Sequence, residues 1–122
     1  MARILVVDDE PDICEVLREM LEGAGYEVDV AREGAGALRA LRAHPVDLLI
    51  TDIFMPGKEG LETIMEIRRD FPAVKVVAMS GGGRTGALNY LRDAIQLGAV
   101  RSLTKPFQES QVLGIVRDTL AS

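Results

Sequence analysis

The chain has 122 residues, of which 48% are apolar, and its 14 basic and 19 acidic side chains leave a formal net charge of −5. A chain of this length forms one ordinary domain with its own core, so we expect a single domain over residues 1–122 and no effector domain. The acidic balance argues against direct binding of nucleic acid or anionic membranes, the single cysteine excludes an internal disulfide, and the apolar runs are too short to cross a bilayer.

Short aliphatic runs alternate along the chain with longer segments in which apolar residues recur at helical spacing. The predicted strands are residues 4–7, 28–30, 46–50, 74–79 and a weaker run at 100–103. The predicted helices carry apolar stripes within residues 13–21, 38–41, 61–67, 88–97 and 112–120. Pro11 suits the first turn of the first helix, and Gly23 and Gly25 suit its end. The stripe of this helix leaves Cys14 off its apolar face.

The order of these elements predicts the fold. A helical crossover returns the chain in the same direction, so consecutive strands pair in parallel. The first, third and fourth strands are almost wholly apolar, as expected of strands covered on both faces, whereas Glu27 and Asp29 place the second strand at an edge. We therefore expect an α/β fold, a doubly wound (βα)5 three-layer sandwich with a five-stranded parallel sheet in flavodoxin-like order. Sites in such folds form beyond the carboxyl ends of the strands.

Polar residues gather at the carboxyl ends of the predicted strands. Asp8 and Asp9 follow the first strand, Asp52 the third, Ser80 the fourth and Lys105 the fifth. Carboxylates about 4 Å apart repel by roughly 4 kcal/mol per pair at an effective dielectric near 20, so the cluster requires a cation. Oxygen ligands favour Mg²⁺, or Mn²⁺ in its place, over zinc. A lysine and a hydroxyl beside such an ion suit a transferred phosphoryl group.

Taken together, these segments resemble the receiver domain of response regulators in two-component signalling, in particular a stand-alone, chemotaxis-regulator-like receiver. The matching segments are Val7-Asp8-Asp9-Glu10-Pro11, Thr51-Asp52-Ile53-Phe54-Met55-Pro56-Gly57, Met79-Ser80-Gly81 and Leu103-Thr104-Lys105-Pro106-Phe107. The resemblance runs from end to end of the chain, and the spaced set is far more specific than any one segment.

The resemblance implies a role for each residue of the cluster. Asp52 would be the phosphoacceptor, taking a phosphoryl group from a sensor histidine kinase or a histidine phosphotransfer protein. Asp9, Asp52 and the backbone carbonyl of Phe54 would bind Mg²⁺ or Mn²⁺, with Asp8 acting through a metal-bound water. Ser80 and Lys105 would bind the phosphoryl oxygens. The Lys105-Pro106 peptide bond would be cis.

The resemblance also implies a phosphorylation switch or a phosphorelay shuttle or sink, which is a signalling protein in the cytoplasm rather than an enzyme with an external substrate. Its downstream protein target is not specified by the sequence. Two departures from the family pattern affect the output route: Ser102 stands where receivers commonly carry an aromatic residue, and the segment after Ser80 is long and rich in glycine. The predicted switch region is Ser80, Gly81, Gly82, Gly83, Arg84 and Ser102.

Several alternatives compete with this interpretation. Asp8 and Asp9 are also good helix-capping residues, and Asp52 is also a good turn residue. A pseudo-receiver would bind partners without phosphorylation. A flavodoxin-like FMN binder would need a phosphate-cradling loop after the first strand, where the acidic run 8–10 would repel phosphate. A haloacid-dehalogenase-type hydrolase would need an Asp-x-Asp nucleophile and a cap domain, and the sequence has neither.

Overall fold

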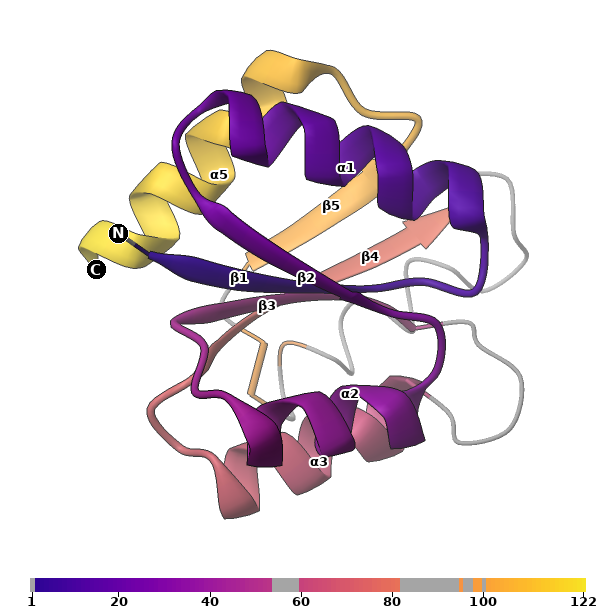
Figure 1. Ribbon diagram of the computed structural model, residues 1–122, viewed down its shortest axis with the longest axis vertical. Helices are drawn as coiled ribbons and strands as arrows, with labels where there is room; N and C mark the ends of the chain where they lie inside the picture. Colours follow the sequence, from indigo (N-terminus) through magenta and orange to yellow (C-terminus); the bar gives the residue numbers. More distant parts are fainter. Residues whose placement is uncertain (1, 54–59, 82–94, 96–97, 100) are drawn as a thin grey trace.

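The computed structural model describes residues 2–53, 60–81, 95, 98–99 and 101–122. A parallel sheet of five strands runs through its centre in the order β2-β1-β3-β4-β5 (Figure 1). The strands are β1 (Arg3–Val7), β2 (Glu27–Ala31), β3 (Leu48–Asp52), β4 (Lys75–Gly81) and β5 (Arg101–Lys105). The predicted parallel sheet in flavodoxin-like order is therefore confirmed.

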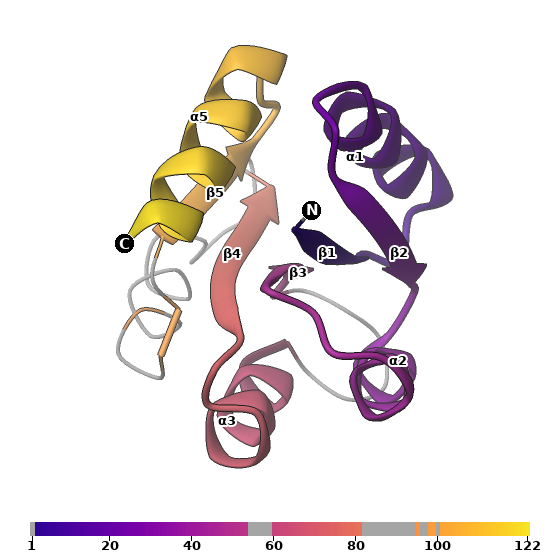
Figure 2. The same cartoon turned by 60° about the vertical axis from the view of Figure 1, so that its left-hand side comes forward.

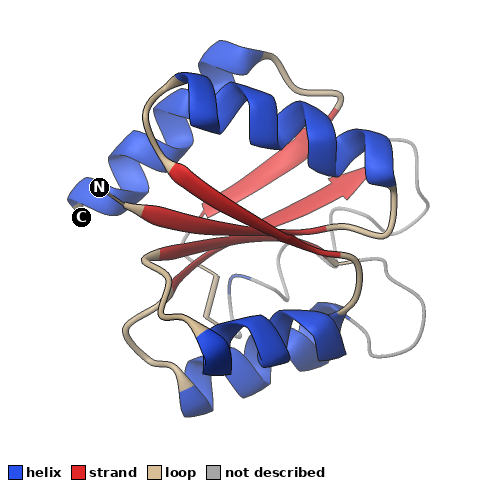
Figure 3. Cartoon of the chain, in the orientation of Figure 1, coloured by secondary structure: helices blue, strands red, loops and turns tan. Residues whose placement is uncertain are grey.

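Helices cover both faces of the sheet and make the molecule a three-layer sandwich (Figures 1 and 3). One face carries α1 (Pro11–Gly23) and α5 (Glu109–Ala121), and the other carries α2 (Gly34–Ala43) and α3 (Gly60–Asp70). The view in Figure 2 shows the two helix pairs on opposite sides of the sheet. Most of the helix predicted over residues 88–97 lies outside the described residues. Among the described helices, none has the length and apolarity needed to span a membrane.

Burial along the strands follows the sequence pattern. Four of the five β1 residues and every residue of β3 are buried, because helices cover both faces of these central strands. The outermost strand β2 instead exposes Glu27 and half-exposes Asp29, and both carboxylates pair with Arg3 of β1 at 3.1 and 2.9 Å. The predicted edge position of this strand is confirmed.

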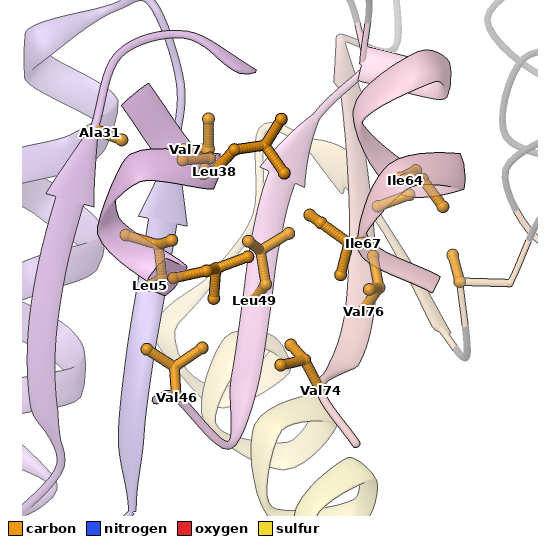
Figure 4. Packing of buried hydrophobic residues seen from close by; sticks show 14 of the residues in the cluster. Leu5, Val7, Ala31, Leu38, Val46, Leu49, Ile64, Ile67, Val74 and Val76 are labelled. Carbon is orange, nitrogen blue, oxygen red and sulfur yellow. The ribbon is translucent and has the colours of Figure 1, made fainter. Parts of the chain in front are cut away.

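The sheet divides the hydrophobic core into two clusters. The cluster beneath α2 and α3 includes Leu5, Leu49, Ile64, Ile67 and Val76, which interlock between the sheet and the two helices (Figure 4). The cluster on the other face is built from the alternate strand positions and from α1 and α5; its largest fully buried members are Ile4, Leu17, Leu21, Leu48, Ile50 and Met79. Alternate residues of each central strand therefore anchor opposite layers, which fixes the strand register.

The buried face of α1 differs from the predicted stripe. Leu17 and Leu21 are fully buried as expected, but Cys14 is also buried, at 4% exposure, whereas Val16 is 42% exposed. Residues 14, 17 and 21 follow the i, i+3, i+7 spacing of one helix face, so the face turned to the sheet is centred closer to Cys14 than to Val16. The prediction that Cys14 lies off the apolar face is wrong.

Two glycines adopt backbone conformations that other residues avoid. Gly25, just beyond the end of α1, has φ +98°, and Gly98, ahead of β5, has φ +128°. A Cβ atom on Gly98 would also lie 2.4 Å from Cγ of Arg68, whose guanidinium donates to the carbonyl oxygens of Pro72 and Val74 at 3.2 and 3.1 Å. Arg68 thus ties the end of α3 to the start of β4 while its stem passes against Gly98.

Candidate functional site

The carboxyl ends of the strands bring the predicted site residues to one edge of the sheet. Asp52 is the last residue of β3, Lys105 is the last residue of β5, and Ser80 is the last but one of β4. The strands β3, β4 and β5 thus each end two residues further along the chain than the sequence predicted. Asp8 directly follows β1, and its backbone N–H donates to the Ala31 carbonyl at the end of β2 (3.1 Å). Parallel pairing therefore places residues from the ends of β1, β3, β4 and β5 together.

Lys105 joins two of the carboxylates. Its Nζ atom lies 2.8 Å from Asp8 Oδ2 and 2.9 Å from Asp52 Oδ2. The Asp8 and Asp52 side chains are almost completely buried, and the Lys105 side chain retains 15% exposure. One ammonium group therefore bridges the ends of β1 and β3 in a position shielded from water, where charge-assisted hydrogen bonds are strong.

The electrostatics of the site follow from this contact. Burial raises the pKa of Asp8, and the negative charge of Asp52 acts in the same direction, although the hydrogen bonds from Lys105 and from the Glu10 N–H oppose it. Burial works to lower the pKa of Lys105, but the hydrogen bonds and charges of Asp8 and Asp52 outweigh it, so the pKa is raised. Lys105 therefore keeps its proton, and two carboxylates share one positive charge.

A second acidic residue set begins at Asp8. Ligand oxygens of Asp8, Asp9 and Glu10 all lie within 4.8 Å of one another. Three carboxylates that converge in this way form the donor set that suits a hard divalent cation, so these residues fit Mg²⁺ or Mn²⁺. Glu10 is not among the ligands expected from the sequence. Its position directly after the paired aspartates was the available signal.

The contacts of Asp8 decide against a mere capping role. Glu10 occupies the N-cap position of α1, and its side chain forms no capping hydrogen bond. Asp8 Oδ1 instead accepts the Glu10 N–H at 2.9 Å, which holds residues 8–10, called the acidic turn below, in place. The Asp8 carbonyl oxygen accepts a hydrogen bond from Cys14 Sγ at 3.3 Å, so the buried thiol supports the same turn from within α1.

Other predicted site residues have more varied surroundings. Ser80 is fully buried, and its Oγ atom forms no hydrogen bond within the described part of the chain. Gly81 ends β4, and Ser102 lies exposed in β5. Phe54, Gly82, Gly83 and Arg84 fall outside the described residues. The Lys105-Pro106 peptide bond is cis, as the resemblance implied.

Comparison with characterised proteins places the chain among regulatory relatives. The chain is 37% identical over 119 residues to the nitrogen assimilation regulatory protein NtrX of Azorhizobium caulinodans, and 37% identical over 117 residues to the transcriptional regulatory protein KdpE of Mycobacterium tuberculosis. These matches cover 96% of the chain but only 26% of NtrX and 50% of KdpE. The chain thus spans between a quarter and a half of the length of these relatives.

Solved structures of similar proteins have the same fold as this chain and match almost its whole length. The receiver domain of NtrX from Brucella abortus superimposes with a TM-score of 0.92 at 31% identity, and the match covers 98% of each chain. The response regulator protein TrrA from Thermotoga maritima, solved in complex with Mg²⁺-BeF, gives a TM-score of 0.85 at 37% identity over 98% of this chain and 99% of TrrA. The sequence profile of the response regulator receiver domain matches residues 4–117. The chain therefore belongs to the response regulator receiver domain family.

Proposed function

We propose that Asp52 accepts a phosphoryl group from the phosphohistidine of a sensor histidine kinase or of a histidine phosphotransfer protein. The observation that carries this proposal is the contact of Lys105 Nζ with the buried carboxylates of Asp8 and Asp52 at 2.8 and 2.9 Å. A carboxylate held beside an ammonium group and an acidic turn has the components of metal-assisted phosphoryl transfer. The receiver domain family to which the chain belongs supports the same reaction.

The transfer is a displacement at phosphorus. An oxygen of the Asp52 carboxylate attacks the phosphorus atom, and the new P–O bond forms as the P–N bond to the donor histidine breaks. The electron pair of the broken bond remains on the imidazole, which takes up a proton from water. Lys105 is placed to pair with a phosphoryl oxygen, and the Ser80 hydroxyl, which lacks a hydrogen-bond partner within the described residues, supplies a donor for another oxygen.

Asp8, Asp9, Asp52 and the backbone carbonyl of Phe54 would hold Mg²⁺ or Mn²⁺, with Asp8 acting through a bound water. When bound, the divalent ion supplies positive charge beside the transferring phosphoryl oxygens. The observation that supports a metal site here is the convergence of the Asp8, Asp9 and Glu10 oxygens within 4.8 Å of one another. In the metal-free protein, Lys105 offsets part of the negative charge of Asp8 and Asp52.

The direct test is phosphorylation of the purified chain with acetyl phosphate, read by intact mass and peptide mapping. We expect labelling of Asp52 in the presence of Mg²⁺ or Mn²⁺ and none in EDTA. Asp52→Asn abolishes labelling, because the amide is not a nucleophile for phosphorus. Asp9→Ala raises the Mg²⁺ concentration needed for half-maximal labelling by about tenfold or more, as expected from the loss of one carboxylate ligand.

Asp47→Asn is the matched control, because this exposed aspartate precedes β3 at the opposite end of the sheet and accepts the Arg3 N–H at 2.9 Å. It should be labelled like the wild type. A phosphoryl group mapped to another residue of the wild-type protein contradicts the assignment of Asp52. Absence of labelling under all metal conditions, with retained binding to a kinase, favours the pseudo-receiver alternative.

The place of this receiver in a pathway remains a prediction. We propose that it acts as a phosphorylation switch or as a phosphorelay shuttle or sink, with a kinase upstream and a protein target downstream. The prediction of a domain that works without an effector also stays a prediction, since the regulators that the chain matches extend well beyond the matched region. A phosphotransfer screen against the histidine kinases of the source organism identifies the donor.

A further inference from the structure

A hollow lies beside the acidic turn, between the end of β2 and the start of α2. Its volume is about 520 Å³, and its lining residues are Asp9, Val30, Ala31, Arg32, Glu33, Gly36 and Arg39. We call it the Arg32 hollow. Gly36 contributes no side chain to the lining, and a Cβ atom there would be in van der Waals contact, at 3.6 Å, with both Ala31 Cβ and Arg39 Nη2.

The lining of the Arg32 hollow is hydrogen-bonded to the candidate phosphorylation site through Ala31. The hydrogen bond from the Asp8 N–H to the Ala31 carbonyl fixes the end of β2 beside the acidic turn. Arg32 is the residue directly after Ala31, so it follows that hydrogen bond along the chain. Arg32 and Asp9 also line the same hollow, which places a guanidinium group near the acidic turn.

The two arginines of the hollow differ in their partners. Arg39 Nη2 lies 3.8 Å from Glu33 Oε1, so Arg39 has a carboxylate partner. Arg32 is exposed and forms no ion pair with the other described residues. Asp9, a member of the acidic set, also lines the hollow, and its negative charge repels an approaching anion. Arg32 is thus a guanidinium without a carboxylate partner in the described part of the chain, and it lines the same hollow as Asp9.

We propose that the Arg32 hollow is the approach site for the phosphoryl group of a dianionic phosphodonor, and that Arg32 is a specificity-determining residue for such donors. The proposal rests on phosphorylation of Asp52. With acetyl phosphate, the Asp52 oxygen bonds to phosphorus while the bond between phosphorus and the acetate oxygen breaks, and acetate leaves with the electron pair. Arg32 acts on the encounter, by offsetting the charge of Asp9 and its neighbours for the incoming anion.

The experiment compares phosphorylation rates at saturating Mg²⁺ and low ionic strength. Arg32→Ala should slow labelling by acetyl phosphate about two- to fourfold, the size expected for one charge acting on a dianion across roughly a Debye length. Arg32→Lys should retain the wild-type rate. Arg117→Ala is the matched control, because it removes the same charge from an exposed site on α5 whose guanidinium pairs with Asp118 at 3.8 Å. Phosphoramidate, which carries less net negative charge, should show a smaller effect of Arg32→Ala.

A second measurement separates this role from structural damage. Removal of a positive charge beside the acidic turn should tighten Mg²⁺ binding about twofold, measured by calorimetry, while it slows labelling by acetyl phosphate. A distorted site would weaken both. The difference between Arg32→Ala and wild type should also vanish at about 1 M salt, where exposed charges are screened.

Two outcomes are distinguishable from each other. If wild type is labelled on Asp52 and Arg32→Ala is labelled equally fast, the approach site is refuted and the function of Asp52 stands. If wild type is not labelled at all, the proposed function itself fails. A phosphorylated histidine phosphotransfer protein as donor tests the source of the phosphoryl group: an Arg32 effect confined to that protein also refutes the approach site for small dianionic donors.

Discussion

Lys105 holds two carboxylates with one ammonium group, and this arrangement leaves the site short of positive charge. Asp8 is fully buried and within 2.8 Å of Lys105 Nζ, yet it shares that cation with Asp52. Buried carboxylates that are incompletely neutralised destabilise a folded protein. The residues that suit the site for a divalent cation therefore reduce the stability of the metal-free chain.

The substitution Asp8→Asn should stabilise the metal-free protein. A carboxyl with a raised pKa binds its proton more tightly in the folded than in the unfolded chain. The stabilisation that this proton gives is fully present below the ordinary pKa of aspartate and is lost as the pH rises through the raised pKa of Asp8. At neutral pH the charged Asp8 therefore costs stability. We expect Asp8→Asn to increase the free energy of unfolding in EDTA at pH 7 by about 1 kcal/mol.

Urea unfolding at pH 7 measures this change, with Asp118→Asn as the control, since that aspartate side chain on α5 is 63% exposed. The gain of Asp8→Asn should shrink at about pH 4, where the wild-type carboxyl is protonated more in the folded than in the unfolded chain. In excess Mg²⁺ the order should reverse, because the variant has lost a group that holds the metal. Lower stability of Asp8→Asn in EDTA would contradict the argument.

At the level of elements, the junction of α3, β4 and the segment before β5 depends on one glycine. Gly98 combines φ +128° with so close an approach to Arg68 that an added Cβ atom would lie 2.4 Å from Arg68 Cγ. Arg68 in turn holds the turn between α3 and β4 through the Pro72 and Val74 carbonyls. Backbone strain and a steric clash therefore act together at this position.

Gly98→Ala should lower the free energy of unfolding by about 3 kcal/mol, from strain in the left-handed region plus overpacking. Gly25→Ala should cost only about 1–2 kcal/mol, because Gly25 has φ +98° but no atom near the new methyl group. Gly23→Ala, with open space and no positive φ, should be neutral or slightly stabilising. Chemical denaturation of the three variants checks this order.

The double variant Arg68→Ala with Gly98→Ala separates the two effects. In the Arg68→Ala background, Gly98→Ala should cost less stability than it does in the wild type, because the steric clash with Arg68 is gone. The cost of backbone strain at residue 98 should remain. A loss at Gly98 equal to that at Gly25 would show that Arg68 moves aside freely.

Elements with a strong local pattern were predictable from the sequence, and those set by packing direction were not. The apolar runs of β1, β3 and β4 and the charged edge strand β2 follow from burial alone. The rotation of α1 about its axis depends on how the helix packs on the sheet. The apolar stripe alone therefore predicts burial of Val16, which is exposed, and places Cys14, which is buried, off the buried face. The strand ends were also predicted too early, because Asp52 and Ser80 are polar yet lie within buried strands.

The candidate site shows the same division. Parallel topology predicts that Asp8, Asp52, Ser80 and Lys105 share one edge, since all stand at carboxyl ends of strands. That Lys105 bridges Asp8 and Asp52, and that Glu10 converges with Asp8 and Asp9, depends on side-chain geometry that a spacing does not encode. Arg32 carries no motif signal at all; only the fold brings it into the lining of the same hollow as Asp9.

At the scale of the whole molecule, the two core clusters are divided by the sheet and unfold together if the strands separate. Cys14 belongs to the cluster beneath α1 and α5, at 4% exposure, and it is the single thiol of the chain. A buried thiol is modified only when its surroundings open. Cys14 is therefore a chemical reporter of how α1 stays docked on the sheet.

We expect the native Cys14 thiol to react with a disulfide reagent about a thousandfold or more slowly than in urea-unfolded protein at the same pH. Its raised pKa means that the folded chain keeps a proton that the unfolded chain releases, so stability falls as the pH rises past the ordinary pKa of a thiol. Cys14→Ala should flatten this alkaline loss in urea titrations from about pH 7 to pH 10. Rapid native labelling, or an unchanged alkaline slope in the variant, would overturn this account.

The charged edge strand has a consequence for the protein at high concentration. An edge strand offers unpaired backbone groups to any second chain that extends the sheet. On β2, Glu27 and Asp29 stand two residues apart and share the single cation of Arg3. Two copies that paired along this edge would bring four carboxylates alongside two guanidinium groups, and like charges on adjoining strands repel. The acidic residues that marked β2 as outermost thus also oppose the growth of the sheet into fibrils.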